Sequence, residues 1–415
     1  MKKPTIPQNL KGFRDLLPQD KRQRDYILNK ARAVAETFGF EPLETPTLEY
    51  ASLLLGKYGE EADKLVYSFV DRGKREVALR YDQTVPTARI LAQYRAQLPK
   101  YFRRYQIQNV FRADKPQKGR FREFTQFDID IFNSQSPLAD AEIIACTYFI
   151  FKSINYPGLK LKLNDREILF SVLKPFVNSQ ASVFSLIQTI DKLEKIGPDG
   201  VTAELIKKGV SLEAVKMILA QFAKVKPSEN LTTIIDYVRA MGVPAEAIEF
   251  VPTLARGLDY YTGMIFEIAV PQYLAGSLGG GGRYDNLIEQ LSGIRTPAVG
   301  IAYGVDRMIE AAKQFNLFKA QTFGTRVMVT VFSSQTLKQS LEAAEFLRNN
   351  NISTELYPEM DKLDKQLKYA DSKQIPFCLI IGEEEAKAGK VTLKNMKQRT
   401  QQTVILAQLN KLLKS

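Results

Sequence analysis

The sequence contains no histidine and only two cysteines, and these absences limit the chemistry that the chain can perform. Without histidine there is no Ser-His or Cys-His nucleophile, no histidine general base and no histidine metal ligand. Cys146 and Cys378 lie far apart, so they support neither a disulfide framework nor a thiolate zinc site. We expect chemistry based on carboxylates, arginines, lysines, tyrosines or a bound ion, in a reducing compartment such as the cytoplasm.

Long apolar segments are also missing. No run of roughly 18 or more apolar residues occurs, and the first residues carry Lys2 and Lys3 without an apolar stretch after them. The sequence therefore predicts neither secretion nor insertion into a membrane.

The composition is that of a folded protein with a charged partner. A length of 415 residues predicts two or three domains, and 45% hydrophobic with 25% charged residues is ordinary for a globular protein. The formal net charge is +12. A strongly basic folded surface indicates a polyanionic partner.

The first part of the chain shows a helix followed by strands. Apolar residues recur at three- and four-residue spacing between 21 and 38, which predicts an amphipathic helix. The next stretch is extended, and its prolines at 42 and 46 favour a sheet edge or a contact between subunits. Segments 75–82, 100–114 and 121–132 are then predicted to be successive strands of one antiparallel sheet.

Two changes of pattern define the domains. Residues 170–250 are rich in helix-forming segments and are predicted to be a helical insertion, after which strand patterns resume. From 326 onward strand and helix patterns alternate, which predicts a small, mostly parallel α/β domain over 326–415. The first domain, an α+β unit with an antiparallel sheet flanked by helices, would span 1–325 around the insertion.

The densest polar motif reads as strand, cationic loop and strand. Arg112 ends one strand, a basic loop follows, and period-two alternation places four side chains of the next strand on one face: Phe124, Gln126, Asp128 and Asp130. Such a face could stack a base and hold an ammonium group. A solvated hairpin explains the same residues, but two aspartates that face a core are costly without partners.

Four shorter stretches add candidates, each with a structural alternative. Arg256 could stabilise developing charge or form a structural ion pair. The glycines at 279–282 could let the backbone approach a ligand or form a flexible loop. Arg307 could bind a phosphate or be a surface arginine. Asp82 and Thr84, two residues apart, would point the same way on a strand and capture an amino group, or mark a turn at Pro86.

Taken together, these stretches resemble a class II aminoacyl-tRNA synthetase of the histidyl-tRNA synthetase family. KGFRDLLP and GFEPLETPTLEY resemble the opening and the dimer-forming motif 1, FRADKPQKGRFREF resembles motif 2, and AVGIAYGVDRMI resembles motif 3. LARGLDYYTG and GSLGGGGRYDNLI are similar to the two histidine-specific signatures of the family. The segment 326–415 resembles the anticodon-binding domain.

The resemblance implies an ATP site. Arg112 would contact the α-phosphate, Phe124 would stack on adenine, and Arg120 with Arg307 would hold the β- and γ-phosphates. These roles suit the side chains, because a guanidinium binds phosphate oxygens and an aromatic ring stacks on a base. Magnesium would bridge the phosphates, and no protein side chain is assigned to it.

The resemblance also implies how histidine and tRNA are held. Tyr260 and Tyr261 would form the imidazole pocket, and Arg256 would bind the substrate and stabilise the charge that develops as its carboxylate attacks ATP. Lys115 and Gln117 would contact the tRNA acceptor end. The α-amino group and its neighbouring atoms would be held by four residues: Asp82, Thr84, Gln126 and Asp130. The family commonly has glutamate where Asp82 and Asp130 stand, and both replacements keep the carboxylate.

The expected activity is the two-step charging of tRNA(His) by a homodimer, with ATP and histidine as substrates. One alternative is a non-catalytic paralogue of the type of the ATP phosphoribosyltransferase regulatory subunit, which binds histidine without charging tRNA. Such paralogues usually lack the C-terminal domain and have a degraded motif 2. This sequence has both the C-terminal domain and an intact motif 2, which favours the enzyme.

Overall fold

The computed structural model describes residues 7–56, 63–115, 121–255, 260–318 and 324–414. The chain divides into two compact units, Met1–Lys319 and Ala320–Ser415. None of the helices in these described ranges has the length and apolar character that a membrane span requires.

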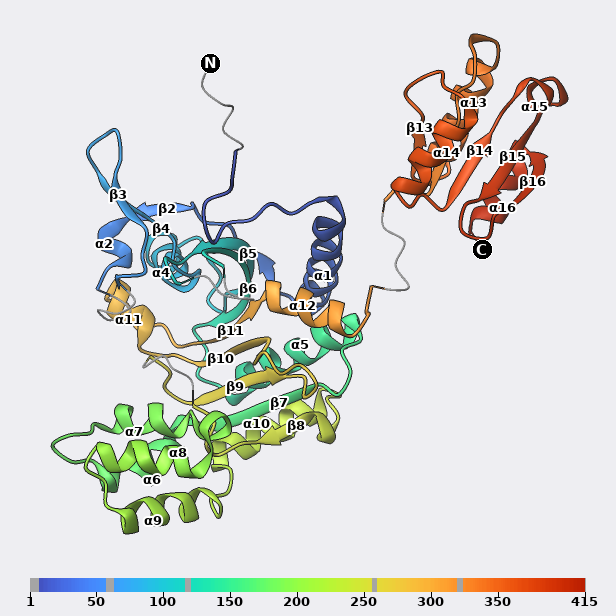
Figure 1. The fold of residues 1–415 in the computed structure, drawn as a ribbon. Helices are drawn as coiled ribbons and strands as arrows, with labels where there is room; N and C mark the ends of the chain where they lie inside the picture. The colour runs from blue at the N-terminus through green and yellow to red at the C-terminus, as the bar shows by residue number, and fades with distance from the viewer. Residues whose placement is uncertain (1–6, 57–62, 116–120, 256–259, 319–323, 415) are drawn as a thin grey trace. The chain divides into compact units, whose positions relative to one another are not determined.

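An eight-stranded sheet forms the centre of the first unit (Figure 1). Its strands follow the order β1-β5-β6-β11-β10-β9-β7-β8. Neighbours run antiparallel except at the two edges, where β1 pairs in parallel with β5 and β8 with β7. The predicted antiparallel sheet is therefore confirmed. The bounds are β1 Glu41–Pro42, β5 Arg103–Phe111, β6 Glu123–Phe132, β7 Lys160–Asp165, β8 Ile248–Phe250, β9 Met264–Ala269, β10 Gly279–Arg283 and β11 Ala298–Gly304.

Helices cover the sheet because of their apolar patterns. The helix α5 (Pro137–Ile154) starts at Ser136, whose side chain accepts from the Leu138 N–H, and ends at Asn155 in the left-handed conformation. It is apolar around most of its circumference because it packs on β6 and β11 and also contacts α1 and α10 (Glu229–Ala240). The helix α12 (Val305–Gln314) directly follows β11 and packs on β6.

The predicted helix near 21–38 is confirmed as α1 (Pro18–Thr37). It buries Ile27, Leu28, Ala31 and Ala35, the apolar positions that carried the prediction. The prediction for the next stretch is also correct, since β1 is an edge strand whose pairing ends at Pro42.

One predicted strand belongs to another sheet. Segment 75–82 contains β4 (Glu76–Leu79), which pairs with β2 (Leu48–Tyr50) and β3 (Ser68–Val70) in a separate three-stranded sheet beside α2 (Ala51–Leu54). Its continuation is also not a strand. Thr84 is the first residue of α4 (Thr84–Gln93), a helix that neither the strand nor the turn interpretation predicted.

The glycine cluster is a strand and not a loop. Residues 279–282 lie in β10, between β9 and β11, and all are buried. A Cβ at Gly281 would overlap the Gly300 carbonyl oxygen and lie 2.6 Å from Ile301 Cα. The missing side chains let neighbouring strands approach closely. The helix α11 (Leu287–Ser292) follows this strand after a short connection.

The chain between β7 and β8 is helical. Its helices are α6 Arg166–Leu173, α7 Val183–Ile190, α8 Leu193–Lys207, α9 Leu212–Phe222 and α10, with short 3-10 turns at Lys174–Phe176 and Ala245–Ala247. The apolar side chains of α6 to α9 form one core cluster that continues into α4 and into Phe102 and Phe132 beside the sheet. In contrast, α10 packs on α5.

The second unit contains a five-stranded sheet in the order β13-β12-β14-β15-β16. The parallel pairing predicted here holds for β13, β12 and β14, whereas β15 and β16 extend the sheet as an antiparallel hairpin. Its core contains Val327, Leu347, Leu379 and Leu393. The bounds are β12 Val327–Val329, α13 Ser334–Asn349, β13 Thr354–Leu356, α14 Leu363–Ser372, β14 Phe377–Ile380, α15 Glu383–Ala388, β15 Lys390–Asn395, β16 Thr400–Ile405, a 3-10 turn Leu406–Gln408 and α16 Leu409–Lys414.

The glycine strand gives a stability prediction. Gly281→Ala should destabilise the protein by roughly 1–3 kcal/mol, because the new methyl group overlaps backbone atoms that cannot move away. Gly304→Ala is the matched control, since its Cβ would meet no atom closer than 3.7 Å. Urea unfolding measures both variants. Equal midpoints for the two would show that β10 does not require glycine.

Candidate active site

Three polar side chains of β6 are buried on one face of the sheet. Gln126, Asp128 and Asp130 are 8%, 3% and 4% exposed. They belong to the face that period-two alternation predicts. Burying two carboxylates together is unfavourable unless a cation or hydrogen-bond donors face them.

The cation is Arg104 on β5, which is fully buried and lies opposite Asp130 in the strand pairing. Its Nη2 is 2.7 Å from Asp130 Oδ2 and 3.8 Å from Asp128 Oδ2. Its Nη1 donates to Gln106 Oε1 at 2.9 Å and contacts Gln83 Oε1 at 3.5 Å. One guanidinium therefore faces two buried carboxylates, and it is closer to Asp130.

Asp130 is also held on its other oxygen. The Tyr284 hydroxyl donates to Asp130 Oδ1. A Cβ at Gly300, the residue opposite Asp130 on β11, would overlap the same oxygen. Asp130 can thus take this position only because glycine stands beside it.

Tyr284 connects this carboxylate to the tyrosine pair of the first histidine-specific signature. The Tyr260 ring meets Tyr284 edge-on with centroids 5.8 Å apart, and Tyr260 and Tyr261 are 4.6 Å apart. Tyr261 is buried and Tyr260 is half-buried. The two signatures, separate in sequence, therefore meet at Asp130.

The electrostatic environment raises the pKa of both aspartates. Burial is the main cause, and Arg104 opposes it in each case. The pKa of Asp128 is raised well above its ordinary value, with Asp130 and Asp82 adding to the effect and Arg112 opposing it. Asp82 and Arg112 thus lie within electrostatic range of Asp128.

Arg112 follows β5 and lies against two aromatic rings. Its guanidinium carbon is 4.3 Å from the Tyr81 ring centroid and 5.3 Å from that of Phe124, and its Nε donates to the Tyr81 carbonyl at 3.2 Å. Its backbone N–H donates to the Arg122 carbonyl at 2.8 Å. These contacts fix the guanidinium near the acidic face.

Asp82 and Thr84 do not lie on a strand, so the predicted geometry for this pair is wrong. Asp82 Oδ1 accepts from the Val85 N–H at 3.2 Å, which stabilises the start of α4. Between them, Gln83 donates through Nε2 to the Gln126 carbonyl at 2.9 Å. That bond ties the start of α4 to β6.

The remaining predicted residues are distributed as follows. Arg307 lies on α12 and donates through Nη1 to the Ser277 carbonyl at 3.1 Å. The helix starts beside the site, because Gly304 pairs with Gln126. Lys115 is exposed. The other three predicted residues, Gln117, Arg120 and Arg256, lie outside the described residues.

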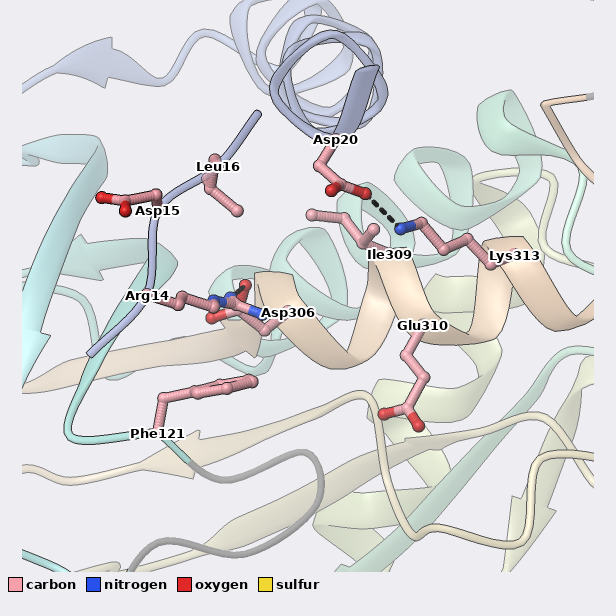
Figure 2. Close-up of a pocket in the computed structure, with 9 residues that line it drawn as sticks. All are labelled: Arg14, Asp15, Leu16, Asp20, Phe121, Asp306, Ile309, Glu310 and Lys313. Carbon is pink, nitrogen blue, oxygen red and sulfur yellow. Dashed lines mark hydrogen bonds and ion pairs between the residues drawn. The ribbon is translucent and has the colours of Figure 1, made fainter. Parts of the chain in front are cut away.

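A pocket of about 330 Å³ lies where the N-terminal segment meets α12 (Figure 2). Arg14 forms an ion pair with Asp306 and stacks over Phe121, 3.7 Å from the ring centroid. Lys313 pairs with Asp20 at 2.5 Å. None of the predicted site residues lines this pocket, and its charged groups join the N-terminal segment to the helix that carries Arg307.

Sequence reasoning missed Arg104 and Tyr284 as parts of the site. Arg104 stands next to Arg103 in a strand-like segment. The only sequence feature that could have indicated its burial is period-two alternation, which places it on the same strand face as Gln106. Tyr284 lies in the second histidine-specific signature, but no role was assigned to it. Asp128 was placed on the polar face but received no role.

An antiparallel sheet with acidic and cationic groups on one face, together with a separate mixed α/β unit, is the architecture that the class II aminoacyl-tRNA synthetase resemblance implies. The family model for histidyl-tRNA synthetase matches residues 12–308, and the model for an anticodon binding domain matches 326–415. The chain belongs to the histidyl-tRNA synthetase family.

Individual relatives agree over nearly the full length. The chain is 38% identical to a histidine–tRNA ligase of Christiangramia forsetii, with 96% of each chain covered. It is 39% identical to one of Wolinella succinogenes, again with 96% of each covered. The crystal structure of histidyl-tRNA synthetase from Nostoc sp. has a TM-score of 0.88 at 31% identity, covering 99% of both chains.

The buried cation gives a second stability prediction. Arg104→Met should destabilise the protein by about 3–5 kcal/mol, because it leaves two buried carboxylates without their counter-charge. Arg75→Met, which breaks an exposed ion pair with Asp71, is the control and should change stability little. Urea unfolding of both variants is the measurement. Similar small losses in both would contradict the role of Arg104.

Proposed function

We propose that the protein activates histidine with ATP to form histidyl-adenylate and pyrophosphate, and then transfers the histidyl group to the 3′ end of tRNA(His). The observation that carries the proposal is the acidic face of β6, with Arg112 beside it and the tyrosine pair joined to it through Tyr284. Family membership supports the same activity.

The amino acid is assigned to the acidic face. Asp82, Thr84, Gln126 and Asp130 would hold its amino group and neighbouring atoms, and the pair Tyr260 and Tyr261 would enclose its imidazole ring. The support is that Asp82 lies within electrostatic range of Asp130 and that Tyr260 contacts Tyr284, which binds Asp130. A carboxylate suits a protonated amine.

ATP is assigned to the arginine and aromatic groups. Arg112 would hold the α-phosphate and Phe124 would stack on adenine, which agrees with the position of the two side chains against each other. Arg120 and Arg307 would hold the outer phosphates. Among the described residues there is no group of three acidic or cysteine side chains that could hold a metal, so magnesium would enter with the phosphates.

The chemistry requires positioning and charge stabilisation more than proton transfer. A carboxylate oxygen of histidine attacks the α-phosphorus, the bond to the bridging oxygen breaks, and pyrophosphate leaves. Arg112 would lie beside the phosphorus, and Arg256 would stabilise the added negative charge. In the second step a tRNA hydroxyl attacks the histidyl carbonyl and AMP leaves.

The tRNA is assigned to both units. The match of 326–415 to an anticodon binding domain supports recognition of the anticodon there. Lys115 and Gln117 would contact the acceptor end from the loop between β5 and β6, and the net charge of +12 suits a polyanion. The catalytic unit would span 1–325 with its helical insertion at 170–250.

A cytoplasmic homodimer is part of the proposal. Four apolar side chains of the three-stranded sheet are exposed: Leu48, Tyr50, Phe69 and Val70, at 44%, 60%, 49% and 63%. Exposed apolar groups gathered on one small sheet favour a protein contact. Leu48 and Tyr50 lie within the segment that resembles motif 1, and Phe69 and Val70 lie on β3 of the same sheet.

The direct test of the activity is ATP–pyrophosphate exchange, with each of the twenty amino acids offered separately. We expect exchange with histidine alone, because this reaction needs adenylation and no tRNA. Binding of histidine without exchange would instead identify a regulatory paralogue. Exchange with a different amino acid would show that the pocket has another specificity.

Arg256→Ala should lower the rate of adenylation by about 10²-fold, since one charge-stabilising group is removed from the transition state. The dissociation constant for histidine should change much less. Pre-steady-state adenylation and histidine binding, measured on the same preparation, separate the two effects. An unchanged adenylation rate would contradict the role assigned to Arg256.

A further inference from the structure

Asp128 differs from Asp130 in its contacts. Asp130 Oδ1 accepts a hydrogen bond from Tyr284, and Asp130 Oδ2 forms an ion pair with Arg104 Nη2 at 2.7 Å. Asp128 Oδ2 is 3.8 Å from Arg104, beyond hydrogen-bond distance, and Asp128 Oδ1 has no donor within the described part of the chain. The side chain is nevertheless only 3% exposed.

A second acceptor on the same strand face lacks a donor. Gln126 Oε1 is buried and unpartnered among the described residues. In proteins the large majority of buried polar groups are paired, so these two neighbouring acceptors indicate a ligand that brings its own donors. Asp130 Oδ2 also has no hydrogen-bond donor among the described residues, but its ion pair with Arg104 compensates its charge.

The charges around Asp128 define what that ligand carries. Arg104 and Arg112 come from β5 and its end, Asp130 from β6, and Asp82 from the chain before α4, while Ala302 stands opposite Asp128 on β11. Arg104 compensates one of the two buried carboxylates, and Asp130 takes its closer contact. The negative charge of Asp128 is therefore left for a cationic donor.

We propose that Asp128 is a further amino-acid-binding residue, whose carboxylate receives a protonated nitrogen of the substrate, with Gln126 Oε1 as the adjacent acceptor. Asp130 keeps its role in the proposed function, and Arg104 and Tyr284 set its position. This assignment rests on the proposed function. ATP does not fit the position, since its phosphates would be repelled by the carboxylates.

The test compares Asp128→Asn with the wild-type protein in two measurements. Histidine binding by calorimetry should weaken at least about tenfold, equal to about 1.4 kcal/mol, because a charge-assisted hydrogen bond is lost. The ligand-free melting temperature should stay the same or rise, because Arg104 and Asp130 remain as a balanced pair. A structural role for Asp128 predicts the reverse, a lower melting temperature with unchanged affinity.

The pH dependence of stability tests the environment of Asp128 in the ligand-free protein. Because the folded-state pKa of Asp128 is raised, the folded protein binds more protons than the unfolded chain, and stability falls as pH rises from the unfolded pKa to the folded one. Asp128→Asn removes this contribution. The melting temperature of the variant relative to wild type should therefore rise with pH over that window.

Two companion experiments complete the test. Asp130→Asn should lower the melting temperature, because it breaks the closer pair with Arg104. Imidazolepropionic acid, which lacks the amino group of histidine, shows which nitrogen of the substrate contacts Asp128. If it binds equally to wild type and to Asp128→Asn, the contact is made by the ammonium group. If it binds more weakly to the variant, the contact is made by the imidazole ring.

The outcomes separate the two proposals. If the wild-type protein exchanges pyrophosphate with histidine and Asp128→Asn does so with the same KM for histidine, the assignment of Asp128 is wrong and the activity stands. If the wild type neither binds histidine nor supports exchange, the proposed function itself is wrong.

Discussion

The buried guanidinium of Arg104 is the interaction on which the site depends. It lies inside the sheet between β5 and β6, and its closest carboxylate is directly opposite in the strand pairing. An ion removed from water is costly, so the surrounding groups must satisfy it, and the glutamine pair Gln83 and Gln106 contributes acceptors. The position of Asp130 follows from this arrangement.

The other motifs of the site are organised around the same pair. Gly300 leaves the space that Asp130 Oδ1 occupies, and Tyr284 donates to that oxygen from the chain that follows the glycine strand. The tyrosine pair contacts Tyr284. The ring contact between Tyr260 and Tyr284 therefore joins the two histidine-specific signatures, and the hydrogen bond from Tyr284 joins them to Asp130.

Much of the fold could be predicted from the sequence because local patterns determine it. Amphipathic spacing located α1, prolines located the edge strand β1, and alternation located β5 and β6. The errors came from tertiary pairing. Nothing in the local pattern of β4 shows that it joins β2 and β3, and a run of glycines has no side-chain signal for a central strand.

Part of the candidate site could likewise be predicted from local sequence patterns. Period-two alternation placed the carboxylates of β6 on one face, and motif resemblance singled out Arg112 and Phe124, since these residues carry recognisable chemistry at fixed spacing. Arg104 and the role of Tyr284 could not be found in this way, because they act through strand register and hydrogen bonding across the sheet. The contrast between Asp128 and Asp130 likewise appears only when the partners of each oxygen are known.

The central claim is that the acidic face of β6 lacks one positive charge until the amino acid binds. The most direct measurement is the number of protons released on histidine binding, obtained by calorimetry in buffers of different ionisation enthalpy. Because binding a cation lowers the raised pKa of Asp128, the wild-type protein should release more protons than Asp128→Asn at the same pH. Equal proton release by the two proteins would contradict the account.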